Sequence, residues 1–438
     1  MRSFHLIQQL KKPGFLVLSG NILNAAFGFI SFLILIRWMG KDDFGHWLLY
    51  LAGFGFVEML RTGFVYTALV KYVAANISEK EKEAYYTAGW LISIFITFVL
   101  SLLIVLINLS IPSWIEKINM SLFFNWYPVV VWLMLPVNLE SWIAHANQKF
   151  RKMILPQIFS SGFFNLFLIV YAISNLYYGI SDFSLFQIIL WHSLIRLVLA
   201  CKYAFGQRKI IRKSLVSINW EKTHEIIKFG KHSLFSTVGS NFLKSADLLI
   251  IGAMMPVKAV AIYQLPLKLM ELAEIPLRSM ATVSFPKISS KSSEKDYEGI
   301  KQLLKKELGL FFRLAIPAFI LVWIFSKQII LVMAGESYLD SVHILRIFLV
   351  SLVLLPLDRF IGITLDSLNL PQVNSLKVSI MVVINVLGDI IAIWFFQSLE
   401  LVAFVTIVNN LAGVVLGYYW LNKYLSTPSK MVIPVTLN

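Results

Sequence analysis

Cysteine and charged residues are the scarcest features of this chain of 438 residues. The single cysteine, Cys201, permits no internal disulfide. The 7 histidines show no spacing that implies a shared metal ion, and no glycine-rich phosphate-binding loop occurs. Charged residues reach only 14%, against about 25% in ordinary soluble domains. We therefore expect neither a disulfide framework nor a resident cofactor.

Apolar residues are correspondingly abundant. They make up 58% of the chain, which is more than a compact soluble domain can bury, so many of them must face lipid. This excludes a soluble enzyme, a disordered chain and a DNA-binding module. A helix crosses the hydrocarbon core in about 20 residues. We predict an all-α, polytopic membrane protein of about twelve transmembrane helices, with spans at 15–37, 45–70, 85–109, 124–147, 154–177, 183–205, 232–254, 260–285, 307–332, 342–366, 373–396 and 399–424.

The basic residues set the predicted orientation. The formal net charge is +15. With the N-terminus inside, 26 Lys and Arg fall in cytoplasmic segments and 5 in external loops, which is the bias that cytoplasmic loops show. Both termini are therefore predicted to be cytoplasmic. The basic inner surface is expected to attract anionic membrane lipids, and no nucleic-acid partner is expected.

An internal repeat divides the predicted spans into two sets of six. A shift of 216 residues aligns five identical residues, two of them charged: Glu58 with Glu274, Lys71 with Lys287, Leu33 with Leu249, Met39 with Met255 and Leu51 with Leu267. We predict a six-helix lobe at 1–205, a basic cytoplasmic linker at 206–231 and a second six-helix lobe at 232–438. Paired halves of this kind are typical of transporters that rock about a central site.

Several predicted spans contain charged side chains. Each costs at least about 2.5–3.5 kcal/mol at mid-bilayer, so such residues normally face a bundle interior or a wet cavity. The cations suggest a path for an anionic group, because arginine suits bidentate contact with phosphate. The candidate substrate-binding residues are Arg61, Lys268, Arg278, Arg359, Lys244 and Arg346.

The alternative is that these charges form self-neutralising pairs that lock helices together. Glu58 and Arg61 are three residues apart and share one helix face, as such a pair requires. In the eighth span, Lys268 and Arg278 are separated by roughly 15 Å of helix rise, which fits a column of cations better than one local pair.

A second group combines oxygen-bearing side chains at one depth. Asn385 and Asp389 are four residues apart and share a helix face. Counted from the cytoplasmic ends of their spans, Asp247 and Asp389 both lie roughly 23 Å deep, and Thr406 reaches a similar level. These hard oxygen donors form a candidate cation-binding site for Na⁺, or a site that exchanges a proton. The alternative is a hydrogen-bonded polar knot between helices.

Short motifs indicate a family. Residues 37–45 (RWMGKDDFG) resemble the first-hairpin signature of the polysaccharide exporters, which belong to the multidrug/oligosaccharidyl-lipid/polysaccharide exporter superfamily. Residues 252–263, the Phe-Pro-Lys at 285–287 and the Phe-Gly at 229–230 are similar to the pattern of its second half. The resemblance covers essentially the whole chain in span count, duplication and loop lengths.

The resemblance implies two six-helix lobes around a central cavity. Family members that handle O-antigen and related glycans flip an undecaprenyl-diphosphate-linked oligosaccharide from the inner to the outer leaflet. In the related lipid II flippases, cavity arginines contact the diphosphate, a role that would fall on Arg61 and Arg278. This chain departs from them at Asn21 and Asn24, where their first span has cations. Their sodium site would fall here on Asp247, Asn385, Asp389 and Thr406.

We predict a bacterial inner-membrane flippase for a lipid-linked oligosaccharide, with ion-coupled alternating access, Na⁺ or H⁺ as the coupling ion and no enzymatic chemistry. The expected partners are the lipid-linked oligosaccharide, anionic lipids and other membrane proteins of polysaccharide assembly. A multidrug/cation antiporter of the same superfamily is one alternative, although 8 Lys and Arg within the spans favour an anionic ligand. A membrane glycan ligase or polymerase is the other, and it would need a long external loop that this sequence lacks.

Overall fold

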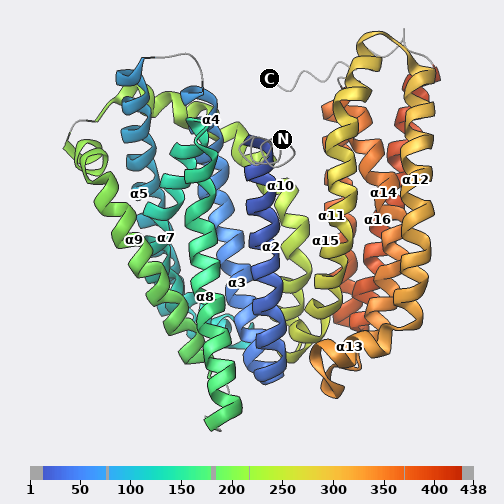
Figure 1. Ribbon diagram of the computed structural model, residues 1–438, viewed down its shortest axis with the longest axis horizontal. Coiled ribbons are helices and arrows are strands. Elements are labelled where there is room, and N and C mark those ends of the chain that lie inside the picture. Colours follow the sequence, from blue (N-terminus) through green and yellow to red (C-terminus); the bar gives the residue numbers. More distant parts are fainter. Residues whose placement is uncertain (1–12, 75–77, 179–183, 217, 369, 427–438) are drawn as a thin grey trace, which may run out of the picture. The chain divides into compact units, whose positions relative to one another are not determined.

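The computed structural model describes residues 13–74, 78–178, 184–216, 218–368 and 370–426, and this part of the chain is built from helices joined by short turns (Figure 1). The predicted all-α class is confirmed. The chain divides into two compact units, Met1–Ser245 and Ala246–Asn438, and the division falls inside one helix, α10. The predicted lobe and linker boundaries stay a prediction.

The first unit holds six membrane-length helical segments and most of α10. Its elements are α2 (Pro13–Trp38), α3 (Lys41–Arg61), η1 (Thr62–Tyr66), α4 (Thr67–Val73), α5 (Glu79–Ser110), α6 (Pro112–Lys117), α7 (Ser121–Ala146), α8 (Phe150–Tyr178), α9 (Leu185–Val216) and α10 (Trp220–Met254). The region predicted as a linker forms the end of α9 and the start of α10. It is attached to α5, because Lys213 pairs with Glu83 at 2.6 Å and the Tyr85 hydroxyl donates to Glu225.

The second unit contains the end of α10 and five further long helices. Its elements are α11 (Lys258–Ser293), α12 (Tyr297–Ile324), α13 (Ser326–Ala334), η2 (Glu336–Tyr338), α14 (Ser341–Ser367), α15 (Pro371–Phe396) and α16 (Leu399–Ser426). Of the twelve long helical segments in the described ranges, 9 are apolar enough to cross a membrane by length and composition. The other three, α10, α11 and α14, contain the charged residues of predicted spans seven, eight and ten.

The α11–α12 turn and the end of α12 refine the predicted spans. Lys295 takes a left-handed backbone conformation (φ 58°) that reverses the chain after α11. Asp296 then caps α12, accepting a hydrogen bond from the Gly299 amide at 2.8 Å. The predicted span at 307–332 is wrong at its far end, since α12 stops at Ile324 and α13 starts separately. There the Oγ of Ser326 accepts a hydrogen bond from Arg346 Nε at 3.0 Å.

A π-helical turn, η1, directly follows Arg61 in the first unit. Gly230 of α10 packs against it so closely that a Cβ atom there would lie 2.4 Å from the carbonyl oxygen of Phe64. Only glycine permits this approach. π turns inside α-helices are rare overall, and many of those that occur lie at functional sites.

Close packing in the second unit depends on a Gly-x-x-x-Gly sequence in α16. A Cβ at Gly413 would lie 2.5 Å from Asp358 Oδ1, and a Cβ at Gly417 would lie 2.5 Å from Ile361 Cγ2, both on α14. Small residues at this spacing let helix backbones approach closely within a membrane. Helices α14 and α16 accordingly lie side by side (Figure 1), and α15 packs against α16.

Candidate functional site: an oxygen cluster and a charged helix face

Five oxygen-bearing side chains meet in the second unit, and we call this group the oxygen cluster: Asp247 of α10, Tyr263 of α11, Asn385 and Asp389 of α15 and Thr406 of α16. The Tyr263 hydroxyl donates to Asp247 Oδ2 at 2.7 Å. Asp247 also lies beside Asn385 and Asp389, and Tyr263 lies beside Thr406. The structure therefore brings together the four residues predicted as a cation site.

The cluster is buried and largely unpartnered. The exposed fraction is 0% for Asp389, 3% for Asn385 and 9% for Asp247. Five oxygens have no hydrogen-bond partner among the described residues: Asp247 Oδ1, Asn385 Oδ1, Asp389 Oδ1, Asp389 Oδ2 and Thr406 Oγ1. Neither carboxylate forms an ion pair with a described lysine or arginine.

This donor set can hold a cation or a proton. Two buried carboxylates without a cationic partner repel each other and are costly to ionise in an apolar interior. A bound cation or a shared proton removes that cost. All the donors are oxygens, which suits a hard cation such as Na⁺. Among the described residues, no group of three His, Cys, Asp or Glu side chains is placed to hold a metal ion.

Tyr263 was missed as a site residue. In the sequence it appeared only at the end of a family-like stretch, and nothing in its spacing pairs it with Asp247, sixteen residues earlier. Asn409, three residues after Thr406, is a further buried polar side chain that the sequence analysis did not single out. It is 7% exposed and its Oδ1 has no partner among the described residues. A hydroxyl or amide within an apolar run is the sequence signal that could have found both.

Charged residues line one face of α11, and we call them the α11 stripe: Lys268, Glu271, Glu274 and Arg278. Each cation pairs with an acid of the same helix, Lys268 with Glu271 at 2.8 Å and Arg278 with Glu274 at 2.7 Å. The pairs are not sealed from their surroundings, because 47% of the Arg278 side chain and 25% of the Lys268 side chain are exposed. The ion-pair alternative thus describes the local contacts, while both cations remain accessible.

Arg61 has a different environment. Its Nη2 lies 2.6 Å from Glu58 Oε2, its Nη1 donates to Thr97 Oγ1 at 3.0 Å, and Asn138 donates to the same Glu58 oxygen at 3.1 Å. Only 1% of Arg61 is exposed. It presents no free surface to a ligand in this conformation, so a contact with a diphosphate would require the Glu58 pair to open.

The three remaining candidates are dispersed. Arg346 donates to Ser326 and lies 5.9 Å from the Trp323 ring, near the α12–α13 junction. Arg359 is half-buried on α14 and forms no ion pair with any described residue. Lys244 is on α10, and its side chain lies outside the described residues. The structure therefore does not gather all six predicted cations at one place within either unit.

Comparison with known proteins identifies the family. Residues 34–343 match the family described as polysaccharide biosynthesis protein. The chain belongs to this family. The probable low-salt glycan biosynthesis flippase Agl15 from Haloferax volcanii is 25% identical over 223 residues, or 51% of this chain. The match spans 47% of that relative, about half of its length.

Solved transporter structures share the fold of this polysaccharide biosynthesis protein. The lipid II flippase MurJ, in an inward closed conformation, has a TM-score of 0.71 at 14% identity over 93% of this chain and 87% of that one. An inward-facing multidrug resistance MATE family transporter of the MOP superfamily has a TM-score of 0.73 at 14% identity over 96% and 100% of the two chains. At such identities the likeness shows the fold alone.

Proposed function

We propose that this protein is a flippase that moves an undecaprenyl-diphosphate-linked oligosaccharide across a bacterial inner membrane, with both termini cytoplasmic. The observation that supports it best is Arg278, a half-exposed arginine on a membrane-length helix of a polysaccharide biosynthesis protein. Glu274 accepts hydrogen bonds from Nε and Nη2 of Arg278, and Nη1 has no hydrogen-bond partner among the described residues. A guanidinium held in this way can still donate to phosphate oxygens.

The α11 stripe would attract the diphosphate, with Lys268 as a second cation on the same face. Arg359 is a further candidate on α14, because it has no acidic partner among the described residues. The role of Arg61 would be confined to a conformation in which Glu58 releases it. The polyprenyl chain stays in an apolar environment throughout, so only the polar headgroup has to cross.

The oxygen cluster would supply the coupling. It joins α10, α11, α15 and α16, so neutralising its two carboxylates with Na⁺ or H⁺ changes the stability of the contacts among four helices. A cation that binds one conformation better than the other shifts the equilibrium by that difference in affinity. Binding and release of the cation on opposite sides of the membrane would then drive the return of the flippase to its inward-open conformation.

The test is flipping in reconstituted vesicles, followed as exposure of a lipid-diphosphate oligosaccharide to an enzyme outside. We expect Arg278→Gln to slow flipping by roughly 10- to 100-fold, because a charge-assisted hydrogen bond is worth about 1.5–3 kcal/mol. Arg313→Gln, which removes an exposed arginine from α12, is the matched control. If wild-type protein never makes the lipid-linked oligosaccharide accessible to the outside enzyme, the proposal is overturned.

Coupling is tested separately with Asp389→Asn. A gradient of Na⁺ or H⁺ should accelerate flipping by the wild type and have no effect on this variant, while flipping without a gradient continues. A variant that still responds to the gradient would contradict the role of the oxygen cluster and leave the substrate proposal standing.

A multidrug/cation antiporter remains the second candidate. Glu271 is 46% exposed, so the α11 stripe offers acids as well as cations to a ligand. In the same vesicles, an antiporter would exchange a lipophilic cationic dye for Na⁺ or H⁺ and leave the lipid-linked oligosaccharide where it was.

A further inference from the structure

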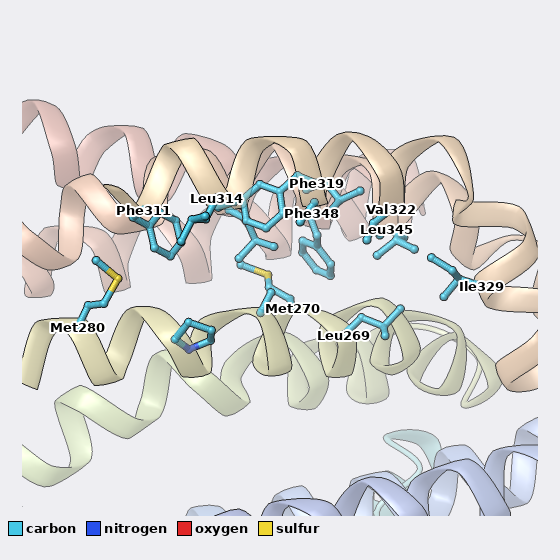
Figure 2. A pocket seen from close by; sticks show the side chains of 16 residues that line it. Leu269, Met270, Met280, Phe311, Leu314, Phe319, Val322, Ile329, Leu345 and Phe348 are labelled. Atoms are coloured by element: carbon cyan, nitrogen blue, oxygen red, sulfur yellow. The ribbon is translucent and has the colours of Figure 1, made fainter. Parts of the chain in front are cut away.

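An apolar groove with a volume of about 440 Å³ lies in the second unit between α11, α12 and α14, and we call it the α11–α12 groove. Figure 2 shows Leu269 and Met270 of α11 facing Phe319 and Phe348 across it. All of its lining side chains are apolar. Along α12 the lining extends from Phe311 to Val322, which is about 17 Å of helix.

The groove stays open because small side chains stand where the helices face each other. Ala273 of α11 and Ala315 and Ala318 of α12 line it. Protein interiors pack to high density, and an apolar space without polar partners does not hold ordered water. An apolar molecule from the membrane is therefore the occupant that the lining accepts, and Met270 and Met280 can adapt to its shape.

Helix α11 presents two different faces. Leu269, Ala273, Pro276 and Met280 follow helical spacing and line the groove. The α11 stripe lies on the opposite face, since Arg278 is displaced from both Pro276 and Met280 by about 200° around the helix. One helix thus separates a charged face from an apolar groove, which are the two chemistries of a lipid that has an anionic headgroup and a long hydrocarbon tail.

We propose that the α11–α12 groove binds the isoprenoid chain of the lipid-linked substrate. This inference rests on the proposed flippase function. A bilayer phospholipid could fill the groove, but it would contact α11 only there. The isoprenoid chain of the substrate is joined to the diphosphate headgroup, so the substrate contacts α11 both in the groove and at the α11 stripe. Binding at two linked points raises the effective concentration of the second contact. Ala315 and Ala318 lie between Phe311 and Phe319 along α12, and their short side chains leave room for the methyl branches of an isoprenoid chain.

The experiment uses the full chain in vesicles of phosphatidylethanolamine and phosphatidylglycerol, with two photoreactive undecaprenyl diphosphates. One has a diazirine in the distal part of its chain and the other has it at the headgroup. We expect the chain probe to label peptides that contain Met270, Met280 or Phe311. Excess unlabelled undecaprenyl diphosphate should suppress that labelling at least tenfold, and the same excess of phosphatidylglycerol should not.

Filling the groove provides the matched comparison. Ala318→Phe should reduce labelling by the chain probe at least tenfold, while labelling by the headgroup probe should persist but require a higher probe concentration, because the linked chain contact is lost. Leu321→Phe, at a position of α12 that is 56% exposed and outside the groove lining, should change neither. Ala273→Leu is a second filling variant if Ala318→Phe does not fold, as judged by its melting temperature.

The outcomes separate the two proposals. Headgroup labelling without chain labelling in the groove overturns this inference and leaves the proposed function intact. Equal competition by phosphatidylglycerol identifies a bilayer-lipid site and also overturns it. If neither probe labels the wild-type protein, the proposed function itself is contradicted.

Discussion

The ammonium of Lys377 lies 2.5 Å from Asp358 Oδ1, and only 2% of the lysine side chain is exposed. Lys377 is one of the 26 lysines and arginines predicted to lie in cytoplasmic segments, because it is close to the start of α15. Instead it belongs to a buried row on α15 that continues through Met381 and Asn385 to Asp389. An ion pair between α14 and α15 therefore stands on the same helix face as the oxygen cluster.

Removing one member of this pair should destabilise the protein strongly. Lys377→Met leaves the Asp358 carboxylate uncompensated, so the free energy of unfolding should fall by about 3–5 kcal/mol. The double variant with Asp358→Leu should recover most of that loss. Lys213→Met breaks the Glu83 pair, whose side chains are 55% and 40% exposed, and should cost less than about 1 kcal/mol. Equal losses in the two single variants, measured by denaturant unfolding in detergent, would contradict this.

The Tyr263 hydroxyl should set the affinity of the oxygen cluster. Tyr263→Phe removes the donor to Asp247 Oδ2, so half-saturation by Na⁺ should rise by roughly 5- to 10-fold, in line with about 1 kcal/mol per hydrogen bond. Tyr50→Phe is the control, because Tyr50 is 0% exposed and its hydroxyl has no partner among the described residues. Calorimetric titration measures the Na⁺ affinity of both variants. An unchanged affinity in Tyr263→Phe would exclude Tyr263 from the site.

Gly413 should be intolerant of any side chain. A Cβ there would lie 2.5 Å from Asp358 Oδ1 and 2.7 Å from Met381 Sδ. Gly413→Ala must displace the Asp358 carboxylate and the Met381 side chain, and it should cost about 1–3 kcal/mol, the range found for overpacked interiors. Gly309→Ala, where nothing lies within 4 Å, should be neutral or stabilise α12 by up to about 1 kcal/mol. In detergent, the melting temperature of Gly413→Ala should therefore fall below that of the wild type, and that of Gly309→Ala should stay the same or rise.

The N-terminal cap of α12 should depend on pH. The hydrogen bond from Lys291, followed by that from the Gly299 amide, lowers the pKa of Asp296 below its ordinary value of 3.8. A lowered folded-state pKa stabilises the fold above the unfolded pKa, and this contribution is lost as the pH falls through the folded pKa. Protection of the first amides of α12 from hydrogen exchange, corrected for intrinsic rates, should therefore hold at neutral pH and fall below about pH 4.

Asp296→Asn provides the control for this cap. The amide oxygen still accepts from Gly299, but the variant has no charge to titrate, so its protection should stay constant over the same range. A pH response of equal size in the variant would mean that another group is responsible.

The oxygen cluster was predictable because it depends on quantities that a sequence contains. Helix spacing places Asn385 and Asp389 on one face, and a rise of 1.5 Å per residue places Asp247 and Thr406 at their depth. The acid–arginine pairs followed from the same spacing. The internal repeat aligns Glu58 with Glu274, and the structure gives each of them an arginine one turn later, at 2.6 Å and 2.7 Å.

The contacts between helices could not be predicted from the sequence. Lys377 and Asp358 are nineteen residues apart in the chain, and they meet where α14 and α15 both pack against the Gly413 and Gly417 face of α16. The α11–α12 groove depends on how far α12 stands from α11, which hydrophobic periodicity does not determine. The exposure of Arg278 against the burial of Arg61 likewise depends on which neighbours pack around each pair.

The π turn after Arg61 stores one residue more than an α-helix of the same length would hold. If that extra residue moves along the segment, every side chain it passes turns by about 100° around the axis. Arg61 is the residue immediately before the turn, so a shift by a few positions would withdraw its guanidinium from Glu58 and aim it in a new direction. Such a shift in register would re-aim a buried cation without unwinding the helix.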